Sequence, residues 1–331
     1  MRVLCVLNPR AGGGVAKKVW PSVVAQLDRL GVTHQVLLLE DGMPLADQVV
    51  ALLTAAGPET YGAVAGMGGD GTHSGVINGL MRFKTAFPGI PTPPYAFIPL
   101  GTGNDIAKSL GIRIDDALSP RDLRRAVSAI VHGADYGLDL GTIGNLYFAD
   151  ALTVGLDSSI LKERNTRKRL IERIPVLRSL VRGRFLYTLS LGSRFLRQEL
   201  VESEIEVDGK VWYRGAMLNL VINNTRIYAG DFDFSAEAYA DDGQLDVVLF
   251  AAHTDYLARY LLAIRHNPAR VRELSDDLHR RSMHTQGRRI AIRLSRPEPA
   301  QVDGEEFPGG VTFAVGVVQR ALRIKVPAEL V

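Results

Sequence analysis

The chain has 331 residues, of which 46% are hydrophobic and 23% are charged, and its formal net charge at pH 7 is +3. This length allows two domains with sizeable cores, and the composition is that of an ordinary globular protein. No apolar run approaches the ~20 residues needed to cross a bilayer. A single cysteine, Cys5, excludes an intrachain disulfide framework. Because the apolar stretch at residues 3–7 is too short for a signal peptide, we expect a cytoplasmic protein.

Positive charge is concentrated in residues 161–184. This segment holds nine basic and two acidic residues, a net charge of +7 that leaves −4 for the rest of the chain. Apolar residues alternate with the charged ones, which suits either an anionic membrane surface or a solvated helical face. The segment contains no aromatic side chain for stacking, so we expect no nucleic-acid partner.

In the first third of the chain, short apolar runs alternate with helical patterns. Strands are predicted over residues 2–7, 32–39, 61–65 and 95–98, and helices over residues 15–30, 44–56, 106–110 and 121–132. This alternation favours a parallel, doubly wound α/β sheet, in which ligands bind at the carboxyl ends of the strands. Three of those ends carry glycine-rich polar loops, which predicts a ligand site there.

The most informative loop is Gly68-Gly69-Asp70-Gly71-Thr72, which follows the third predicted strand. Glycines let a backbone approach a ligand closely, and Thr72 and Ser74 are predicted caps for the helix that follows. A strand, a glycine turn and a helix N-terminus form a nest of N–H groups suited to phosphate. Asp70 adds a carboxylate that would bind Mg²⁺ with the phosphate or accept a proton from an attacking group.

The loop also matches the dinucleotide fingerprint. That fingerprint needs an acidic residue about 20 positions further on for the ribose, and residues 81–98 contain no Asp or Glu. We therefore do not favour NAD as the ligand. A plain tight turn would explain some of the glycines but not Asp70. The first loop, residues 8–14, lacks the lysine of a Walker loop.

After residue 133 the pattern changes to short β-strands. Strands are predicted over residues 134–142, 146–154, 201–207, 210–213, 217–222, 245–250, 289–294, 311–317 and 321–326, and helices over residues 161–198 and 255–265. We predict an α/β domain over residues 1–133 and a β-rich, antiparallel, sandwich-like domain with a helical insertion over residues 134–331. The final residues could pack back on the first domain.

Two acidic turns stand out in the second half. The first, at Asp241 and Asp242, precedes a predicted strand. Clustered carboxylates and free carbonyls can hold a divalent cation, and an ordinary β-turn has the same composition. The second turn contains Asp303 and Glu305, and solvated carboxylates are the simpler interpretation of it. The residues by themselves leave both alternatives open.

Together, the glycine loops and the acidic turns resemble the diacylglycerol kinase catalytic-domain family, in particular its bacterial soluble lipid kinases, with sphingosine and ceramide kinases as relatives. The matching sequences, in order along the chain, are Asn8-Pro9, Gly68-Gly69-Asp70-Gly71-Thr72, Gly101-Thr102-Gly103-Asn104-Asp105, Asn223-Asn224, Asp241-Asp242-Gly243 and Asp303-Gly304-Glu305. The Gly-Gly-Asp-Gly-Thr loop also occurs in NAD kinases and phosphofructokinases, and the later elements separate this family from those.

The resemblance implies a nucleotide-binding domain of the NAD-kinase and diacylglycerol-kinase type, followed by a lipid-substrate domain. It implies an ATP- and Mg²⁺-dependent kinase that phosphorylates a lipid hydroxyl, with diacylglycerol as the first choice. Nucleotide binding is implied for Asn8, Gly68, Gly69, Asp70, Gly71, Thr72, Thr102, Asn104 and Asp105. Glu305 is implied as the base that acts on the lipid hydroxyl, and Asp70 is the competing candidate for that role.

The resemblance also implies two metal sites. Asp70 and Asp105 would lie near the catalytic Mg²⁺, whereas the turn at Asp242 would hold a structural Mg²⁺ with backbone carbonyls from Tyr239 and Gln244. The expected partner is a lipid at the anionic inner membrane surface, where the protein would be peripheral, and a homodimer is left open.

The chain departs from the family pattern after the second predicted strand, where residues 39–41 lack the threonine that the family often has, and in the glycine loop. The family usually continues the loop as Thr-x-Asn-Glu-Val, whereas Gly75 stands here in place of the glutamate. A catalytically impaired regulator that binds nucleotide or lipid is therefore an alternative. A kinase of NAD or of another soluble acceptor is a second alternative.

Overall fold

The structure is a computed structural model that describes residues 1–39, 42–57, 61–112, 119–172, 194–195, 197–228, 232–233, 238–257 and 283–330. Its amino-terminal part contains β1 (Arg2–Leu7), α1 (Ala11–Arg29), β2 (Thr33–Leu38), α2 (Leu45–Ala56), β3 (Ala63–Gly68), α3 (Asp70–Ala86), β4 (Tyr95–Pro99), α4 (Asp105–Ser109) and α5 (Pro120–His132). Strands and helices alternate as the apolar pattern predicts. The strands pair in the order β4-β3-β1-β2, and each of these pairs is parallel.

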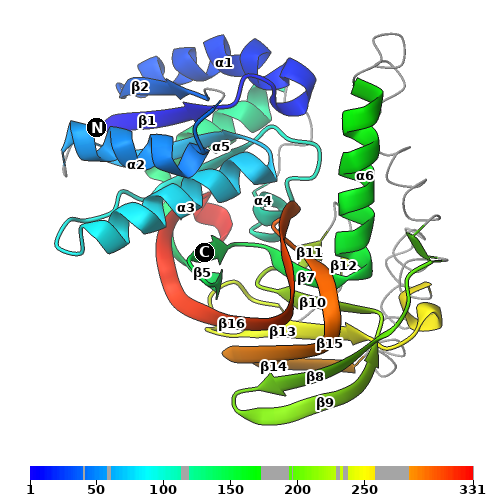
Figure 1. The fold of residues 1–331 in the computed structure, drawn as a ribbon. Helices are drawn as coiled ribbons and strands as arrows, with labels where there is room; N and C mark the ends of the chain where they lie inside the picture. The colour runs from blue at the N-terminus through cyan, green and yellow to red at the C-terminus, as the bar shows by residue number, and fades with distance from the viewer. Residues whose placement is uncertain are drawn as a thin grey trace.

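Helices cover both faces of this parallel sheet, which explains why its strands are apolar on both faces. On one face, Cys5 lies in a core with Val23 of α1 and Val127 of α5. On the other face, Val64 packs with residues of α2 and α3. Figure 1 shows α1 above the strands and α2 and α3 below them. The doubly wound α/β fold predicted for this part is therefore confirmed.

The carboxy-terminal part is built mainly of strands. It contains β5 (Ala134–Ile143), β6 (Leu146–Phe148), β7 (Ala151–Gly155), α6 (Leu156–Glu172), β8 (Val201–Val207), β9 (Lys210–Met217), β10 (Asn219–Asn223), β11 (Ile227–Tyr228), β12 (Phe232–Asp233), β13 (Leu245–Phe250), β14 (Met283–Gly287), β15 (Arg289–Val302), β16 (Glu305–Val326) and a short 3₁₀ helix (Ala328–Leu330). Neighbouring strands in the order β14-β13-β10-β7-β15-β16 are antiparallel. This confirms the β-rich second half with a helical insertion.

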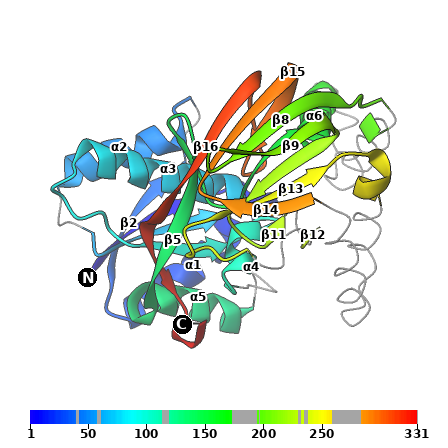
Figure 2. The ribbon, with the colours of Figure 1, turned by 90° about the horizontal axis from the view of Figure 1, so that it is seen from below.

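The long strand β16 connects the two parts. Its 22 residues pair antiparallel with β15 and β5. Near its end, Ile324 and Lys325 pair in parallel with Tyr95 and Ala96 of β4. Figure 2 shows β16 and β5 side by side between the α/β part and the β-rich part. One hydrogen-bonded sheet therefore runs through both parts.

Several predicted bounds differ from the structure. The strand predicted over residues 146–154 is two strands, β6 and β7, because the chain bends at residues 149–150. The strands predicted over residues 311–317 and 321–326 are one strand, because a bulge with Arg320 at a φ of 47° bends β16 without ending its pairing with β5. The helices predicted over residues 161–198 and 255–265 lie partly outside the described residues.

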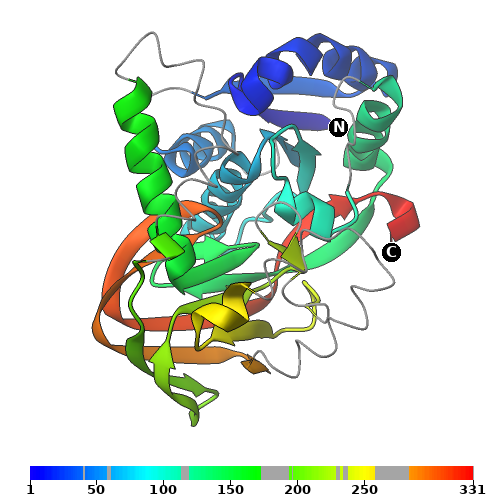
Figure 3. The same ribbon diagram turned by 90° about the vertical axis from the view of Figure 1, so that its right-hand side faces the viewer.

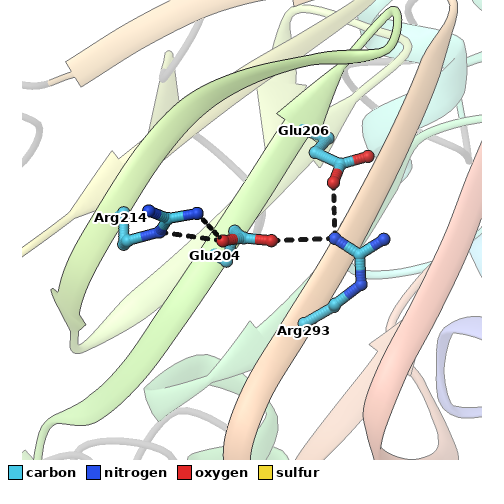
Figure 4. A network of polar contacts seen from close by, with 4 residues as sticks. All are labelled: Glu204, Glu206, Arg214 and Arg293. Carbon is cyan, nitrogen blue, oxygen red and sulfur yellow. Dashed lines mark hydrogen bonds and ion pairs between the residues drawn. The ribbon is translucent and has the colours of Figure 1, made fainter.

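A hairpin joins β8 and β9 at Asp208-Gly209, as the sequence predicts. Both residues have positive φ, 50° and 81°, which is the backbone of the two-residue turn that suits the twist of a hairpin. On the exposed face beside it, Arg293 Nη1 lies 2.9 Å from Glu204 Oε1 and 2.5 Å from Glu206 Oε1. Arg214 of β9 also pairs with Glu204, so charged side chains cross three adjacent strands (Figure 4).

Helices α2 and α3 pack closely because two glycines of α3 face α2. A Cβ on Gly75 would lie 2.9 Å from Leu45 Cδ2, and a Cβ on Gly79 would lie 2.7 Å from Val49 Cβ and 2.9 Å from the Ala46 carbonyl oxygen. These distances are well below the ~3.5 Å at which carbon atoms pack favourably. Gly75 therefore has a packing role, and a glutamate at this position would be directed into α2.

We expect Gly79→Ala to destabilise the protein. Alanine favours a helix over glycine by about 1 kcal/mol. Overpacking against α2 costs about 2–3 kcal/mol here, the upper part of the usual range, because the new Cβ meets the Ala46 backbone carbonyl and the branched Val49 Cβ. The free energy of unfolding should therefore fall by about 1–2 kcal/mol. Denaturant unfolding would measure this. Gly89→Ala is the matched control, because a Cβ there meets nothing within 4 Å. A Gly79→Ala protein as stable as the parent would contradict this account of the helix contact.

Candidate active site

Loops at the carboxyl ends of β1, β3 and β4 meet at one edge of the parallel sheet. Asn8, after β1, donates from Nδ2 to Thr72 Oγ1 at 3.0 Å. Gly68, at the end of β3, accepts a hydrogen bond from the Leu100 N–H at 2.7 Å. A Cβ on Gly101 would lie only 2.4 Å from Gly69 Cα, so the two loops touch through backbone alone. The structure thus brings together the three loops from which the nucleotide site is predicted.

The glycine loop leads directly into α3. This helix begins at Asp70 with Gly69 as its N-cap, so the expectation that Thr72 or Ser74 caps the helix is wrong. Thr72 lies in the first turn instead, and its Oγ1 accepts the hydrogen bond from Asn8. The earlier helix start places the positive end of the helix dipole at the loop itself, which favours an anionic ligand there.

Asp70 is held by the loop after β4. Its Oδ2 accepts a hydrogen bond from the Asn104 N–H at 2.7 Å. Asn104 has a left-handed φ of 58°, and its side chain bonds Gly101 through both the N–H and the carbonyl of that residue. Burial raises the pKa of Asp70, whereas the N–H groups of the β4 loop oppose that rise. Its second oxygen, Oδ1, is buried and accepts no hydrogen bond from the described part of the chain.

Two other predicted nucleotide-site residues differ in their surroundings. Thr102 is exposed on the loop after β4, whereas Asp105 is buried at the start of α4. A Cβ on Gly103 would lie 2.9 Å from Asp70 Oδ2 and 3.3 Å from Asp105 Oδ1. The carboxylates of Asp70 and Asp105 therefore converge on Gly103, while Thr102 points to solvent.

A second pair of carboxylates comes from the β-rich part. Asp303 is buried in the turn before β16 and accepts hydrogen bonds from the N–H groups of Ala149, Asp150 and Ala151 at 2.9–3.2 Å. Its burial raises its pKa to about 6. Asp150 is also buried and accepts a hydrogen bond from Thr225 Oγ1 at 2.6 Å.

Asp150 is a site residue that sequence reasoning missed. Burial raises its pKa well above the ordinary value, and the charges of Asp105, Asp303 and Asp70 raise it further. Asp150 lies inside the single strand predicted over residues 146–154, where no neighbouring motif marks it as functional. The bend between β6 and β7, which only the structure shows, turns it toward the other carboxylates.

Glu305 is the first residue of β16 and lies over the glycine loop. A Cβ on Gly71 would be 2.9 Å from Glu305 Oε1, so this carboxylate occupies the space that glycine leaves free. Desolvation raises the pKa of Glu305, and the positive charges of Arg164 and Lys168 on α6 lower it. The neighbouring Glu306 has different contacts, because its Oε1 accepts a hydrogen bond from Asn165 Nδ2 at 2.8 Å.

The arrangement at Asp70 fits a magnesium ion. Among the described residues, no group of three or more His, Cys, Asp or Glu side chains forms a ready metal site. Magnesium, however, usually keeps several waters and takes one or two carboxylates together with substrate phosphates. The unpaired, buried Oδ1 of Asp70 is such a ligand, and Asp105 lies beside it.

The turn predicted to hold a structural magnesium belongs to a different group of acids. Asp242 Oδ1 accepts a hydrogen bond from the Gln244 N–H at 2.8 Å, and the Gly243 N–H donates to Asp139 Oδ2 at 2.6 Å. Burial raises the pKa of Asp242, and neighbouring acids including Asp139 raise it further. Tyr239 is 65% exposed. A metal ion at this turn stays a prediction.

The buried carboxyl of Asp303 predicts a specific dependence of stability on pH. Its pKa is about 6 in the folded state and about 3.9 in an unfolded chain. The folded protein therefore binds this proton more tightly, and the free energy of unfolding should fall as pH rises from about 4 to 6, by up to about 3 kcal/mol from this group. Asp303→Asn should flatten that fall in denaturant titrations. Asp28→Asn, at an exposed position, should leave the slope unchanged.

Comparison with known proteins agrees with this geometry. Residues 2–143 match the family model described as the diacylglycerol kinase catalytic domain. Residues 167–326 match the model described as the YegS C-terminal NAD kinase beta sandwich-like domain. The two models follow one another in the order of the α/β and β-rich parts of the structure.

Curated relatives match over most of their length. The chain is 23% identical to a diacylglycerol kinase of Bacillus subtilis, over 99% of this chain and 97% of the relative. It is 22% identical to a diacylglycerol kinase of Staphylococcus carnosus, over 92% of this chain and 88% of the relative. These alignments include both parts of the chain.

Solved structures share the fold. A diacylglycerol kinase from Bacillus anthracis superposes with a TM-score of 0.72 at 19% identity, covering 100% of this chain and 98% of the other. An NAD kinase from Archaeoglobus fulgidus, solved in complex with ATP, gives a TM-score of 0.52 at 13% identity, with 100% and 95% coverage. The chain therefore carries the diacylglycerol kinase catalytic domain over residues 2–143 and the YegS C-terminal NAD kinase beta sandwich-like domain over residues 167–326, and it is a kinase that transfers phosphate to an alcohol group.

Proposed function

We propose that this protein is an ATP- and Mg²⁺-dependent lipid kinase that phosphorylates diacylglycerol to phosphatidic acid at the inner surface of the membrane. The observation that carries the proposal is the position of Glu305, whose carboxylate lies against Gly71 of the glycine loop. A base is thereby held beside a loop suited to phosphate. The relatives named diacylglycerol kinase support the choice of acceptor.

Different residues of the chain carry out different parts of the proposed reaction. The N–H groups at the start of α3 bind the phosphates of ATP, because the glycine loop leaves them uncovered and the helix dipole favours negative charge. Glu305 accepts the proton of the lipid hydroxyl, which is a poor nucleophile at neutral pH. Asp70 and Asp105 would hold Mg²⁺, which supplies neutralising charge to the phosphates when it is bound.

Helix α6 is the proposed contact with an anionic membrane. Figure 3 shows it at one edge of the molecule, extending from the β-rich part toward the α/β part. Lys162, Lys168 and Arg169 are exposed on it, and Leu170 beside them is 56% exposed. A basic, partly apolar helix of this kind suits an anionic surface. Residues 173–184 of the predicted basic segment lie outside the described residues, and no described helix is long and apolar enough to span a membrane.

The structure weakens the motive for a catalytically impaired regulator. That alternative rests on Gly75, but a Cβ at this position would be directed at Leu45 of α2. The absence of a glutamate there is explained by helix packing. For the same reason Gly75→Glu does not test activity, because it would disturb the contact between α2 and α3. A soluble acceptor such as NAD would leave the exposed basic face of α6 without a function, and a homodimer stays a prediction.

Glu305→Gln tests the proposed base. A positioned carboxylate contributes about 10²–10⁴-fold to such a proton transfer, so kcat should fall by that factor, while ATP binding should be retained because glutamine keeps the size of the side chain. Labelled ATP and diacylglycerol in mixed micelles would give kcat, and calorimetry would give ATP affinity. Glu306→Gln is the matched control, since Glu306 contacts Asn165 of α6 rather than the glycine loop. Near-parental turnover by Glu305→Gln would move the role of base to Asp70.

The proposed membrane contact has its own test. The double variant Lys162→Glu and Arg169→Glu should weaken binding to anionic vesicles and raise the apparent KM for lipid, with little change in the KM for ATP. At about 1 kcal/mol for each basic residue near the surface, vesicle affinity should fall at least about 30-fold. Arg121→Glu with Arg124→Glu, at exposed positions on α5, makes the same charge change elsewhere. Equal losses for the two double variants would show that net charge, not α6, determines membrane binding.

A further inference from the structure

Helix α6 is held in a defined position beside the candidate site. At its start, Asp157 Oδ2 accepts a hydrogen bond from Asn219 Nδ2 at 2.7 Å, and Tyr256 donates to the other oxygen of the same carboxylate. In its middle, Asn165 Nδ2 donates to Glu306 Oε1 at 2.8 Å. Helix α6 is therefore fixed against both β10 and the start of β16, where Glu305 lies.

Basic residues of this helix differ in whether they are paired with an acid. Arg167 pairs with Glu163 of the same helix, and Arg169 Nη2 lies 3.8 Å from Glu306 Oε1. Arg164 forms an ion pair with neither Glu163 nor Glu306. Its guanidinium donates from Nε and Nη2 to the side-chain oxygen of Asn165, at 3.3 Å and 3.0 Å, and that oxygen belongs to a neutral amide. Within the described part of the chain, no carboxylate lies at ion-pair distance from Arg164.

The positive charge of Arg164 lies close enough to the candidate site to affect Glu305. Arg164 and Lys168 are four residues apart, hence on the same face of the helix, and both charges lower the pKa of Glu305. Arg164 is partly buried, whereas Lys168 is exposed. The guanidinium is therefore the less solvated of the two charges that reach Glu305, and its interaction there is the less screened by water.

The candidate site needs such a cation. Asp150 interacts with Asp70, Asp105 and Asp303, and Glu305 lies against Gly71, next to Asp70 in the chain. The loop after β1 lacks the lysine of a Walker loop. A phosphoryl group spreads its negative charge over its outer oxygens during transfer, and kinases and related enzymes place cations against that charge. Metal ions supply part of this charge, and a nearby arginine supplies the rest in several such enzymes.

We propose that Arg164 donates hydrogen bonds to the phosphoryl group as it is transferred, an inference that rests on the proposed kinase function. In that step the acceptor oxygen forms a bond to the γ-phosphorus of ATP, and its proton passes to the Glu305 carboxylate. The bond from the γ-phosphorus to the β,γ-bridging oxygen breaks, and ADP leaves with the electron pair. A planar guanidinium donates two parallel hydrogen bonds to phosphate oxygens. To form them, Arg164 gives up only its hydrogen bonds to the neutral side-chain amide of Asn165.

Arg164→Gln is the direct test. An arginine in this role contributes ~10³–10⁵-fold in other phosphoryl-transfer enzymes, and here kcat should fall at least ~10²-fold, with the KM values for ATP and lipid little changed. Arg167→Gln is the matched control. It removes the same charge about one helical turn from Arg164, but Arg167 is paired with Glu163. It should leave kcat within about threefold of the parent, since the paired arginine is not directed at the phosphates.

Two further measurements separate this role from a structural or membrane role. Guanidinium ion at low concentration should restore activity to Arg164→Ala, whereas urea at the same concentration should not. Binding to anionic vesicles and the thermal unfolding midpoint should be the same for Arg164→Gln and Arg167→Gln. If both variants lose activity equally and in proportion to vesicle binding, Arg164 serves membrane docking and the proposal is wrong.

The closing measurement does not depend on the lipid. ADP with aluminium fluoride mimics the phosphoryl group in transfer, and calorimetry gives its affinity for the complete protein with Mg²⁺ present. The parent and Arg167→Gln should bind ADP more tightly when aluminium fluoride is added, and Arg164→Gln should lose most of that gain. A parent that phosphorylates no lipid but shows this pattern would overturn the proposed acceptor and not the role of Arg164. An unchanged gain in Arg164→Gln would overturn that role.

Discussion

Strand β16 is the constraint on which the candidate site depends. Its first residue is Glu305, which lies over Gly71, and near its end Ile324 and Lys325 hydrogen-bond with β4 of the parallel sheet. Between these points it pairs along β15 and β5. Glu305 and the glycine loop are far apart in the sequence, and the backbone hydrogen bonds of β16 join the strand that carries Glu305 to the parallel sheet that carries the loop. This explains why the site can be precise although its residues come from two parts of the chain.

A second constraint is electrostatic. Carboxylates that are buried together cost free energy, because burial and mutual repulsion both disfavour their charged forms. Burial raises the pKa values of Asp70, Asp150 and Asp303, and the charges of neighbouring acids raise the pKa of Asp150 further. A protein retains such an arrangement where cations and phosphates complete it, and this agrees with phosphoryl transfer. The unpaired Arg164 on α6 is a cation that the protein itself supplies.

Helix packing accounts for the departure of this chain from the family pattern. Gly75 and Gly79 let α3 pack closely against α2, so the position at which the family pattern predicts a glutamate is here part of a helix contact. Such a contact exists only between two folded helices, and nothing in a single helical pattern reveals it. The α2–α3 contact in turn supports the first turn of α3, which lies directly after the glycine loop.

The sequence by itself determined the α/β part and the nature of the second half. Its alternating apolar runs gave the parallel strands, because period and turn residues are local properties, and the glycine loops marked the edge of the sheet where Asn8, Asp70 and Asn104 meet. The order of its motifs also indicated the family. Only the tertiary structure decided that Asp150 joins the other carboxylates and that Arg164 is left without an acid partner. Both facts depend on a bend between strands and on contacts between distant segments, and local sequence patterns carry no information about either.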